Sequence, residues 1–508
     1  MEQEPVLELN DIQGNIVPGF KKDSQHFVLL RVIDAQLARN WLRGLAPRLS
    51  SAREVRDAHT VWKGMRRKLG RDPDNLDFLF VNCAISAAGL RKLGLPGIDE
   101  FDDAAFKLGL ESRASVIGDP PNGSGTPGAP ETWLFGSGRR RPDVLVILAA
   151  DDDAWTAKEE RELVASARSS GFQRVHVDRG RVRPGVMAGH EHFGFKDGIS
   201  LPAIRGRASA AADDFVEARL WPPGPEFDPY RPRYAAPGRQ LVWPGHFLFG
   251  CPRQMRDQPE EMRPNSEPPG PTWAKNGSFL VYRRLKQNVS AFQQFLAAAS
   301  ATLRNRGFDP NLTPERLGAL LVGRWASGWP VARDPHTDRG PNQPGENHFR
   351  FSEATNVLLP NDLHPLNSAD PNGMVCPFAA HIRKVQPRDD STDIGPMERT
   401  FQKLIIRRGI TFGPELSHSH EDRGLLFVAY QTSIVDQFEF LMNDWVNDAN
   451  KPHANGGVDP IIGGARDHTL ILNNGNTTFP LTVPGGWVVA TGGEYMFAPS
   501  LSFFSSVL

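Results

Sequence analysis

Runs of apolar residues divide the first part of the chain into strands and helices in a regular order. Residues 26–34 form a short apolar run rich in β-branched side chains, which is typical of a buried strand. The next segment, 35–45, places its apolar residues at helical spacing. The predicted elements are a strand at 26–34, a helix at 35–45, strands at 76–84 and 143–150, a helix from Asp153 to near Gly171, and a strand at 172–178.

The same order returns in the second part of the chain. A strand at 278–285 precedes a helix that Ser290 can cap, and Thr313-Pro314 marks another helix start. Strands at 404–411 and 425–434 and a helix at 435–446 follow. Strand-helix-strand repeated twice in each part predicts an α+β fold made of two ferredoxin-like (βαββαβ) halves with antiparallel sheets.

Two Pro- and Gly-rich stretches interrupt this pattern. Residues 119–142 predict a surface insertion between strands, and residues 201–276 predict the connection between two domains. Because 508 residues exceed one ordinary hydrophobic core, we expect an N-terminal domain at 1–235 and a C-terminal domain at 236–508. Loops of this length form lids or channel walls as readily as plain surface excursions.

Composition narrows the choice of partners. The formal net charge of −1 predicts no strong attraction to nucleic acid or to a membrane surface, and no apolar run is long enough to span a bilayer. The three cysteines are widely spaced and fit neither a disulfide framework nor a zinc site. The N-terminus as written lacks a signal-peptide pattern, which leaves a cytoplasmic protein and a mature secreted form both open.

Three distant segments carry residues that can do chemistry. His190-Glu191-His192-Phe193-Gly194-Phe195-Lys196-Asp197-Gly198 offers a carboxylate between aromatic residues and glycines. Cys376-Pro377-Phe378-Ala379-Ala380-His381-Ile382-Arg383-Lys384 offers an imidazole, and Ile405-Ile406-Arg407-Arg408-Gly409 offers two guanidinium groups. Lys-Asp-Gly alone is ordinary turn chemistry. Together the three segments offer a carboxylate, a candidate axial imidazole and a guanidinium.

At these residues the chain resembles a known family. Gly-Phe-Lys-Asp-Gly at 194–198 resembles the Gly-x-x-Asp-Gly signature of the dye-decolorizing (DyP-type) haem peroxidases, and the segment around His381 resembles their proximal-histidine segment. Residues 11–16, 322–325 and 492–495 are similar to further family landmarks in the expected order. The resemblance implies one haem b per chain, held mainly by the C-terminal half. It also implies oxidation of dyes, phenolic and other aromatic reductants by hydrogen peroxide through a ferryl intermediate.

The resemblance further implies roles on the proximal side of the haem. His381 would be the axial ligand of the iron, as neutral imidazole is in many peroxidases. Asp459 would accept the second ring N–H of that histidine, although an Asp-Pro turn explains the same residue. Arg388 would pair with a haem propionate, and its alternative is a solvent-facing arginine in a loop.

On the distal side the implied catalytic pair is Asp197 and Arg407. Asp197 would move the peroxide proton as acid–base, and Arg407 would stabilise the charge that develops as the O–O bond breaks. On a strand Arg407 and Arg408 point to opposite faces, so only one of them can reach the haem. Leu425 and Phe427 share a strand face and resemble apolar distal-pocket residues, although ordinary core residues would be buried in the same way.

Two alternatives to a peroxidase remain on this scaffold. One is a haem-binding or haem-delivery protein, and the other is a different haem enzyme such as an oxygenase or an iron-releasing relative. A carrier needs neither Asp197 nor Arg407, so the presence of both favours the peroxidase.

Overall fold

The structure is a computed structural model that describes residues 4–71, 73, 76–219, 234–254, 264–356, 358–359, 361–416 and 422–508. Its central feature is a sheet of nine strands in the order β10-β16-β2-β3-β1-β4-β12-β13-β11. Strand β10 also pairs with β13, so the sheet closes into a barrel. No helix in these ranges is long and apolar enough to cross a membrane.

The N-terminal half supplies four neighbouring strands in the order β4-β1-β3-β2, which is the ferredoxin-like arrangement. Its elements are β1 (Ser24–Val32), α1 (Ala35–Leu45), α2 (Ala52–Leu69), β2 (Phe80–Ser86), α3 (Ala87–Lys92), α4 (Ala104–Leu108), β3 (Val144–Ala150), α5 (Asp153–Arg168) and β4 (Phe172–Arg181). The predicted strands and helices of this half are present. The 18-residue helix α2 is an addition that the apolar pattern did not predict.

The C-terminal half repeats the arrangement, with β16-β10-β13 followed by β11 and β12. Its elements are β10 (Ser278–Gln287), α6 (Val289–Asn305), α7 (Pro314–Val322), α8 (His381–Val385), α9 (Met397–Thr400), β11 (Ile406–Arg407), β12 (Ile410–Phe412), β13 (Gly424–Gln431), the π-helical segments η12 (Ile434–Glu439) and η13 (Leu441–Val446), β16 (Val488–Ala498) and α10 (Leu501–Ser506). The predicted α+β fold with two ferredoxin-like halves is therefore confirmed.

Two local predictions in this half were wrong in detail. The N-cap of α6 is Asn288 rather than Ser290, because the Asn288 side chain accepts the N–H of Ala291. The predicted strand at 404–411 is split into β11 and β12, which pair with different stretches of β13. The predicted helix at 435–446 is present, although its turns are π-helical.

The core lies on both sides of the barrel wall. Phe27 and Leu29 of β1 pack in the barrel interior, whereas Val28 and Leu30 pack beneath the outer helices. Successive strand residues point to opposite faces, so a strand buried on both faces is apolar throughout. This explains why β3 shows no alternation and has all of its residues buried.

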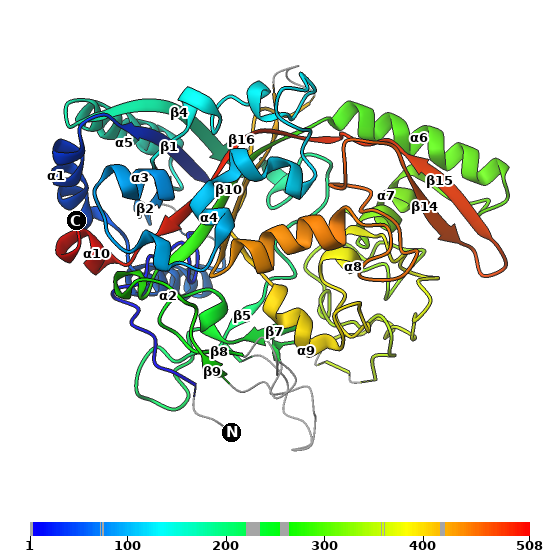
Figure 1. Ribbon diagram of the computed structural model, residues 1–508. Coiled ribbons are helices and arrows are strands. Elements are labelled where there is room, and N and C mark those ends of the chain that lie inside the picture. Colours follow the sequence, from blue (N-terminus) through cyan, green and yellow to red (C-terminus); the bar gives the residue numbers. More distant parts are fainter. Residues whose placement is uncertain are drawn as a thin grey trace.

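The remaining strands form small sheets outside the barrel, and they are β5 (Ala203–Ile204), β6 (Tyr234–Ala236), β7 (Arg239–Val242), β8 (Arg253–Gln254), β9 (Pro264–Ser266), β14 (His468–Asn473) and β15 (Thr478–Val483). The β14–β15 hairpin lies near α6 and α7 at the right of Figure 1. These elements pack around a separate apolar cluster.

The two irregular stretches differ in what the structure describes of them. In the first, residues 121–127 are exposed, in keeping with a surface insertion. The second includes residues 220–233 and 255–263, which lie outside the described residues. The predicted domain boundary between residues 235 and 236 falls in β6 and stays a prediction.

Candidate active site

A cavity of about 310 Å³ lies against the outer face of the C-terminal strands. Arg283, Leu285 and Gln287 of β10 and Leu425 and Phe427 of β13 line one wall. They are alternate residues of neighbouring strands, so all of them point away from the barrel interior. The opposite wall comes from α8, η12 and η13, and the loop at 191–200 borders the cavity as well. Leu425 and Phe427 thus border the cavity, and their role as pocket residues stays a prediction.

His381, the first residue of α8, borders this cavity. Its Nδ1 lies 2.8 Å from Oδ2 of Asp459, which is fully buried. The other carboxylate oxygen of Asp459 accepts the N–H groups of Ile461 and Ile462 at 2.8 and 3.0 Å. These bonds fix the carboxylate, which in turn assigns the ring hydrogen to Nδ1 and leaves the Nε2 lone pair available as a ligand.

The charges of this pair shift both pKa values. Burial lowers the pKa of His381, but the charge of Asp459 and its hydrogen bond outweigh burial and raise it. Burial raises the pKa of Asp459, but the charge and hydrogen bond of His381 outweigh burial and lower it. The carboxylate is therefore ionised and pulls on the imidazole hydrogen, which makes the other ring nitrogen a stronger donor.

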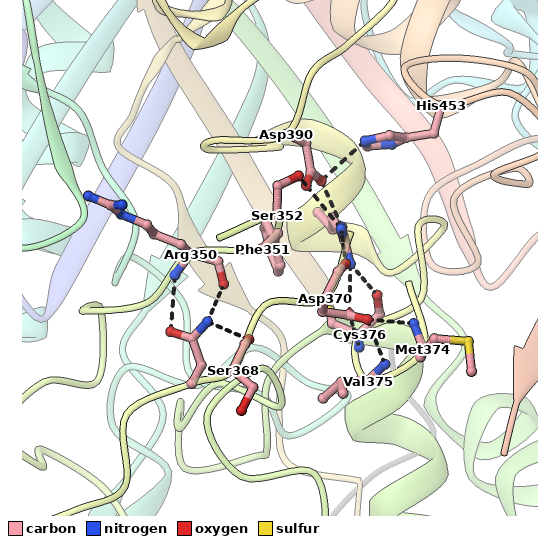
Figure 2. Close-up of polar contacts among 12 residues, drawn as sticks. Arg350, Phe351, Ser352, Ser368, Asp370, Met374, Val375, Cys376, Asp390 and His453 are labelled. Carbon is pink, nitrogen blue, oxygen red and sulfur yellow. Dashed lines mark hydrogen bonds and ion pairs between the residues drawn. The ribbon is translucent and has the colours of Figure 1, made fainter. Parts of the chain in front are cut away.

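The segment that carries His381 is held from behind by a buried arginine. The Arg383 guanidinium donates to both carboxylate oxygens of Asp390, to a carboxylate oxygen and the carbonyl of Asp370, and to the carbonyl of Cys376, at 2.7 to 2.9 Å. All five of its N–H groups are thus satisfied. Asp370 also accepts the N–H groups of Met374 and Cys376 (Figure 2). This network fixes the loop that leads into α8.

Across the cavity Asp197 and Arg407 form an ion pair. Nη1 of Arg407 donates to Oδ1 of Asp197 at 2.6 Å, and both residues border the cavity. Burial raises the pKa of Asp197, but the charge and hydrogen bond of Arg407 outweigh it, so the net pKa is lowered. The charge of His381 also lowers the pKa of Asp197, to a smaller extent.

Arg408 points elsewhere. Its Nε and Nη2 donate to the main-chain oxygens of Asn15 and Ile16, each at 3.0 Å. Ile406 packs in the barrel interior and Arg407 faces the cavity, as expected for neighbouring strand residues. The geometry of β11 therefore agrees with the assignment of Arg407, rather than Arg408, to the cavity.

Arg388 does not line the cavity itself, but its Nη2 donates to Oγ of Ser200, a lining residue, at 3.4 Å. It is buried, its Nη1 donates to the carbonyl of Phe349 at 2.9 Å, and its guanidinium lies 3.6 Å from the centre of the Phe349 ring. A neighbour of Arg388, Arg324, does line the cavity. Arg324 and Arg388 both donate to Oδ1 of Asn347, at 2.9 and 2.5 Å. Pairing of Arg388 with a propionate stays a prediction.

Glu191 is a residue whose contribution the sequence reasoning missed. Its two carboxylate oxygens accept the N–H groups of Phe195 and Phe193, each at 2.8 Å, and Gln287 of β10 donates to it as well. The peptide N–H of Asp197 donates to the carbonyl of Gly189 at 2.9 Å. Glu191 thus closes the turn that ends at Asp197. The only signal in the sequence is an acidic residue between His190 and His192.

Comparisons with known proteins place the chain in one family. The family model of the DyP dimeric alpha+beta barrel domain matches residues 11–184, and the model of the C-terminal part of Dyp-type peroxidases matches residues 253–464. The chain is 32% identical to the dye-decolorizing peroxidase msp1 of Mycetinis scorodonius, over 99% of this chain and 88% of that protein. It is 33% identical to a dye-decolorizing peroxidase of Mycena epipterygia, over 99% and 87%.

A solved structure has the same architecture over its full length. An ancestral D-type dye decolorizing peroxidase matches with a TM-score of 0.76 and 32% identity, covering 99% of each chain. Two family models that together cover most of the chain, full-length relatives above 30% identity and a shared fold lead to one conclusion. The chain is a peroxidase that belongs to the haem-dependent DyP-type family.

Proposed function

We propose that the peroxidase reaction takes place in this cavity on a bound haem b, with His381 as the axial ligand. The cavity fits such a group because an imidazole with an available lone pair and an ionised carboxylate–guanidinium pair border it from different elements. Its strand wall carries Leu425 and Phe427, which suit an apolar macrocycle. The observation that carries the proposal is that both hydrogen-bonded pairs, His381–Asp459 and Asp197–Arg407, meet at one cavity.

Haem, when bound, supplies the iron at which hydrogen peroxide is reduced and from which oxidising equivalents pass to the reductant. The protein's part on this side is to hold His381 at a fixed orientation. Asp459 does so through the 2.8 Å hydrogen bond to Nδ1, which also strengthens the donor character of the imidazole.

On the other side Asp197 acts as acid–base. Its lowered pKa keeps it ionised, so it can take the proton from one oxygen of hydrogen peroxide and return it to the leaving oxygen. Arg407, whose Nη1 is 2.6 Å from that carboxylate, stabilises the negative charge that develops as the O–O bond breaks. The turn closed by Glu191 holds Asp197 in place for both proton transfers.

The proposed reductants are dyes, phenolic compounds and other small aromatic molecules. The first two relatives described above carry the name dye-decolorizing peroxidase, which supports this class of substrate. A haem-binding or haem-delivery protein would need His381 but would not need an ionised carboxylate paired with an arginine. The Asp197–Arg407 pair therefore favours a peroxidase over a haem-binding or haem-delivery protein.

One experiment tests the proposal. Purified protein is examined for a Soret absorption band, then mixed with hydrogen peroxide in a stopped-flow spectrometer, and finally assayed with an anthraquinone dye. We expect a Soret band, its rapid change on adding peroxide, and turnover of the dye. A Soret band that peroxide leaves unchanged would instead support a carrier, and failure to bind haem would overturn every haem-based reading.

A further inference from the structure

A buried lysine lies directly behind the histidine that we propose as the haem ligand. Lys384 of α8 has no exposed surface. Its ammonium donates to the main-chain oxygen of Asp448 at 2.7 Å and to those of Lys451 and Gly457. An ammonium group has three N–H donors and no acceptor, so these three carbonyls satisfy it completely.

The three carbonyls belong to one loop, and that loop leads into Asp459. The loop starts after η13, and its two ends are drawn together by the bond from Gly457 N–H to Ala449 carbonyl at 2.8 Å. Asp459 follows two residues later and donates its own N–H to the carbonyl of Val446 at 3.0 Å. Lys384 therefore connects the helix that begins with His381 to the loop that delivers its carboxylate partner.

A second contact holds the same loop at its far side. His453 stacks on Phe378 with ring centroids 4.2 Å apart, and its Nε2 lies 3.1 Å from Oδ2 of Asp390 (Figure 2). Asp390 is in turn fixed by Arg383, the residue before Lys384. Two consecutive cations of α8 thus hold the loop: Lys384 bonds it directly, and Arg383 acts through Asp390.

Burial of a cation is costly unless its partners compensate for lost water. Burial lowers the pKa of Lys384 to about 8, although the nearby charge of Asp459 raises it. An apolar residue could fill this space without that cost. The complete set of carbonyl contacts indicates that the ammonium holds the loop in place rather than merely filling space.

We propose that Lys384 is a positioning residue, which holds loop 448–457 so that Asp459 meets Nδ1 of His381 and thereby sets the reduction potential of the haem iron. The inference rests on the proposed function, because it takes His381 as the axial ligand. It adds a role for a residue that touches neither the haem site nor the peroxide.

Loss of the ammonium has two effects of opposite sign on the potential. Removal of a positive charge alone stabilises the more positive ferric iron and lowers the reduction potential. Release of the loop weakens the hydrogen bond from His381 to Asp459, makes the imidazole a poorer donor, and raises the potential. The positioning role therefore predicts a rise, and a purely electrostatic role predicts a fall.

The test compares haem-loaded full-length Lys384→Met with Lys451→Met as the matched control. Lys451 lies in the same loop and contributes one of the three carbonyls through its main chain, but its side chain is 38% exposed and its ammonium bonds Asp444 at 2.9 Å. Two quantities are measured: the iron–imidazole stretching frequency of the ferrous protein by resonance Raman spectroscopy, and the reduction potential. We expect a lower frequency and a higher potential in Lys384→Met, and no change in the control.

A second variant guards against loss of folding. Lys384→Gln keeps two N–H donors without the charge, and we expect it to give shifts in the same direction that are smaller than those of Lys384→Met. The positioning role is overturned if folded Lys384 variants keep the wild-type frequency, or if their potential falls. Absence of an iron–imidazole band from wild-type protein would instead show that the proposed axial ligand is wrong, so the two failures are distinguishable.

Discussion

Arg407, the last residue of β11, and Arg408, which follows it, allow a sharp test of the proposed distal site. Arg407→Leu removes the guanidinium that lies 2.6 Å from Asp197, whereas Arg408→Leu removes one that bonds the carbonyls of Asn15 and Ile16. Both substitutions exchange a long cation for an apolar side chain. Arg407→Leu removes the charge at the cavity, and Arg408→Leu removes it away from the cavity. Each substitution therefore serves as the control for the other.

The expected magnitudes follow from these contacts. Loss of one donor that stabilises developing charge typically costs 10²–10³ in rate, or about 3–4 kcal/mol in activation free energy, and we expect this for Arg407→Leu. Arg408→Leu leaves two carbonyls without their donor, which costs on the order of 1–3 kcal/mol each in stability. We therefore expect slow peroxide reduction in the first variant and a lowered free energy of unfolding in the second.

The pH dependence provides an independent check. Burial raises the pKa of Asp197, and in the wild type Arg407 outweighs that effect and lowers it. The ionised carboxylate is the reactive form, so the rate falls as pH decreases through this pKa. Without Arg407 the two largest effects that lower this pKa are lost, while burial still raises it against the smaller effects of Gly198 and His381. The pKa then rises, and we expect the acid limb of the rate profile to move to higher pH.

Stopped-flow spectroscopy of the haem band after mixing with hydrogen peroxide measures the bimolecular rate at each pH, and denaturant unfolding measures stability. The reasoning is refuted if Arg408→Leu slows the peroxide reaction more than Arg407→Leu does. It is refuted equally if Arg407→Leu is slow but keeps the wild-type acid limb, because the ion pair would then have no effect on the carboxylate.

Three further predictions concern other parts of the site. Asp197→Asn should slow the peroxide reaction about 10²–10⁴-fold and remove the acid limb, and wild-type rates across the pH range would contradict its role as base. His381→Ala should lose haem or bind it weakly, which the ratio of Soret to protein absorbance measures. Arg383→Met removes the guanidinium that pairs with the buried carboxylates of Asp370 and Asp390 and should lower the free energy of unfolding by about 3–5 kcal/mol, so an unchanged denaturant midpoint would contradict its role.

Local sequence signals predicted most of the sheet because each strand carries its own apolar run. They failed where two signals competed. Asn288 and Ser290 are both good N-caps, and only the position of the preceding strand decides between them. Helix α2 has a complete capping box in Ser51 and Glu54, but its buried residues are confined to Ala52, Val55 and Ala58, so apolar spacing alone does not indicate the helix.

The candidate site was predictable only in its motif-bearing residues. The side chains of Asp197, His381 and Arg407 match family motifs. Glu191 and Lys384 stand in the same segments, but they act through main-chain groups of other residues. A carboxylate that caps a turn or an ammonium that binds three carbonyls leaves no pattern in the spacing of side chains. Such residues become visible only when the backbone around them is known.

The pairing of the two halves brings the distal residues together. Asp197 follows β4 in the N-terminal half, and Arg407 belongs to the C-terminal half, 210 residues later. Strands β4 and β12 meet at Gly180 and Phe412, where a Cβ on Gly180 would lie only 2.3 Å from Ile410. Glycine thus permits the close approach that joins the halves on this side of the barrel. Because the carboxylate and the guanidinium come from opposite halves, neither half alone contains the pair that we propose for peroxide cleavage, and closure of the barrel assembles it.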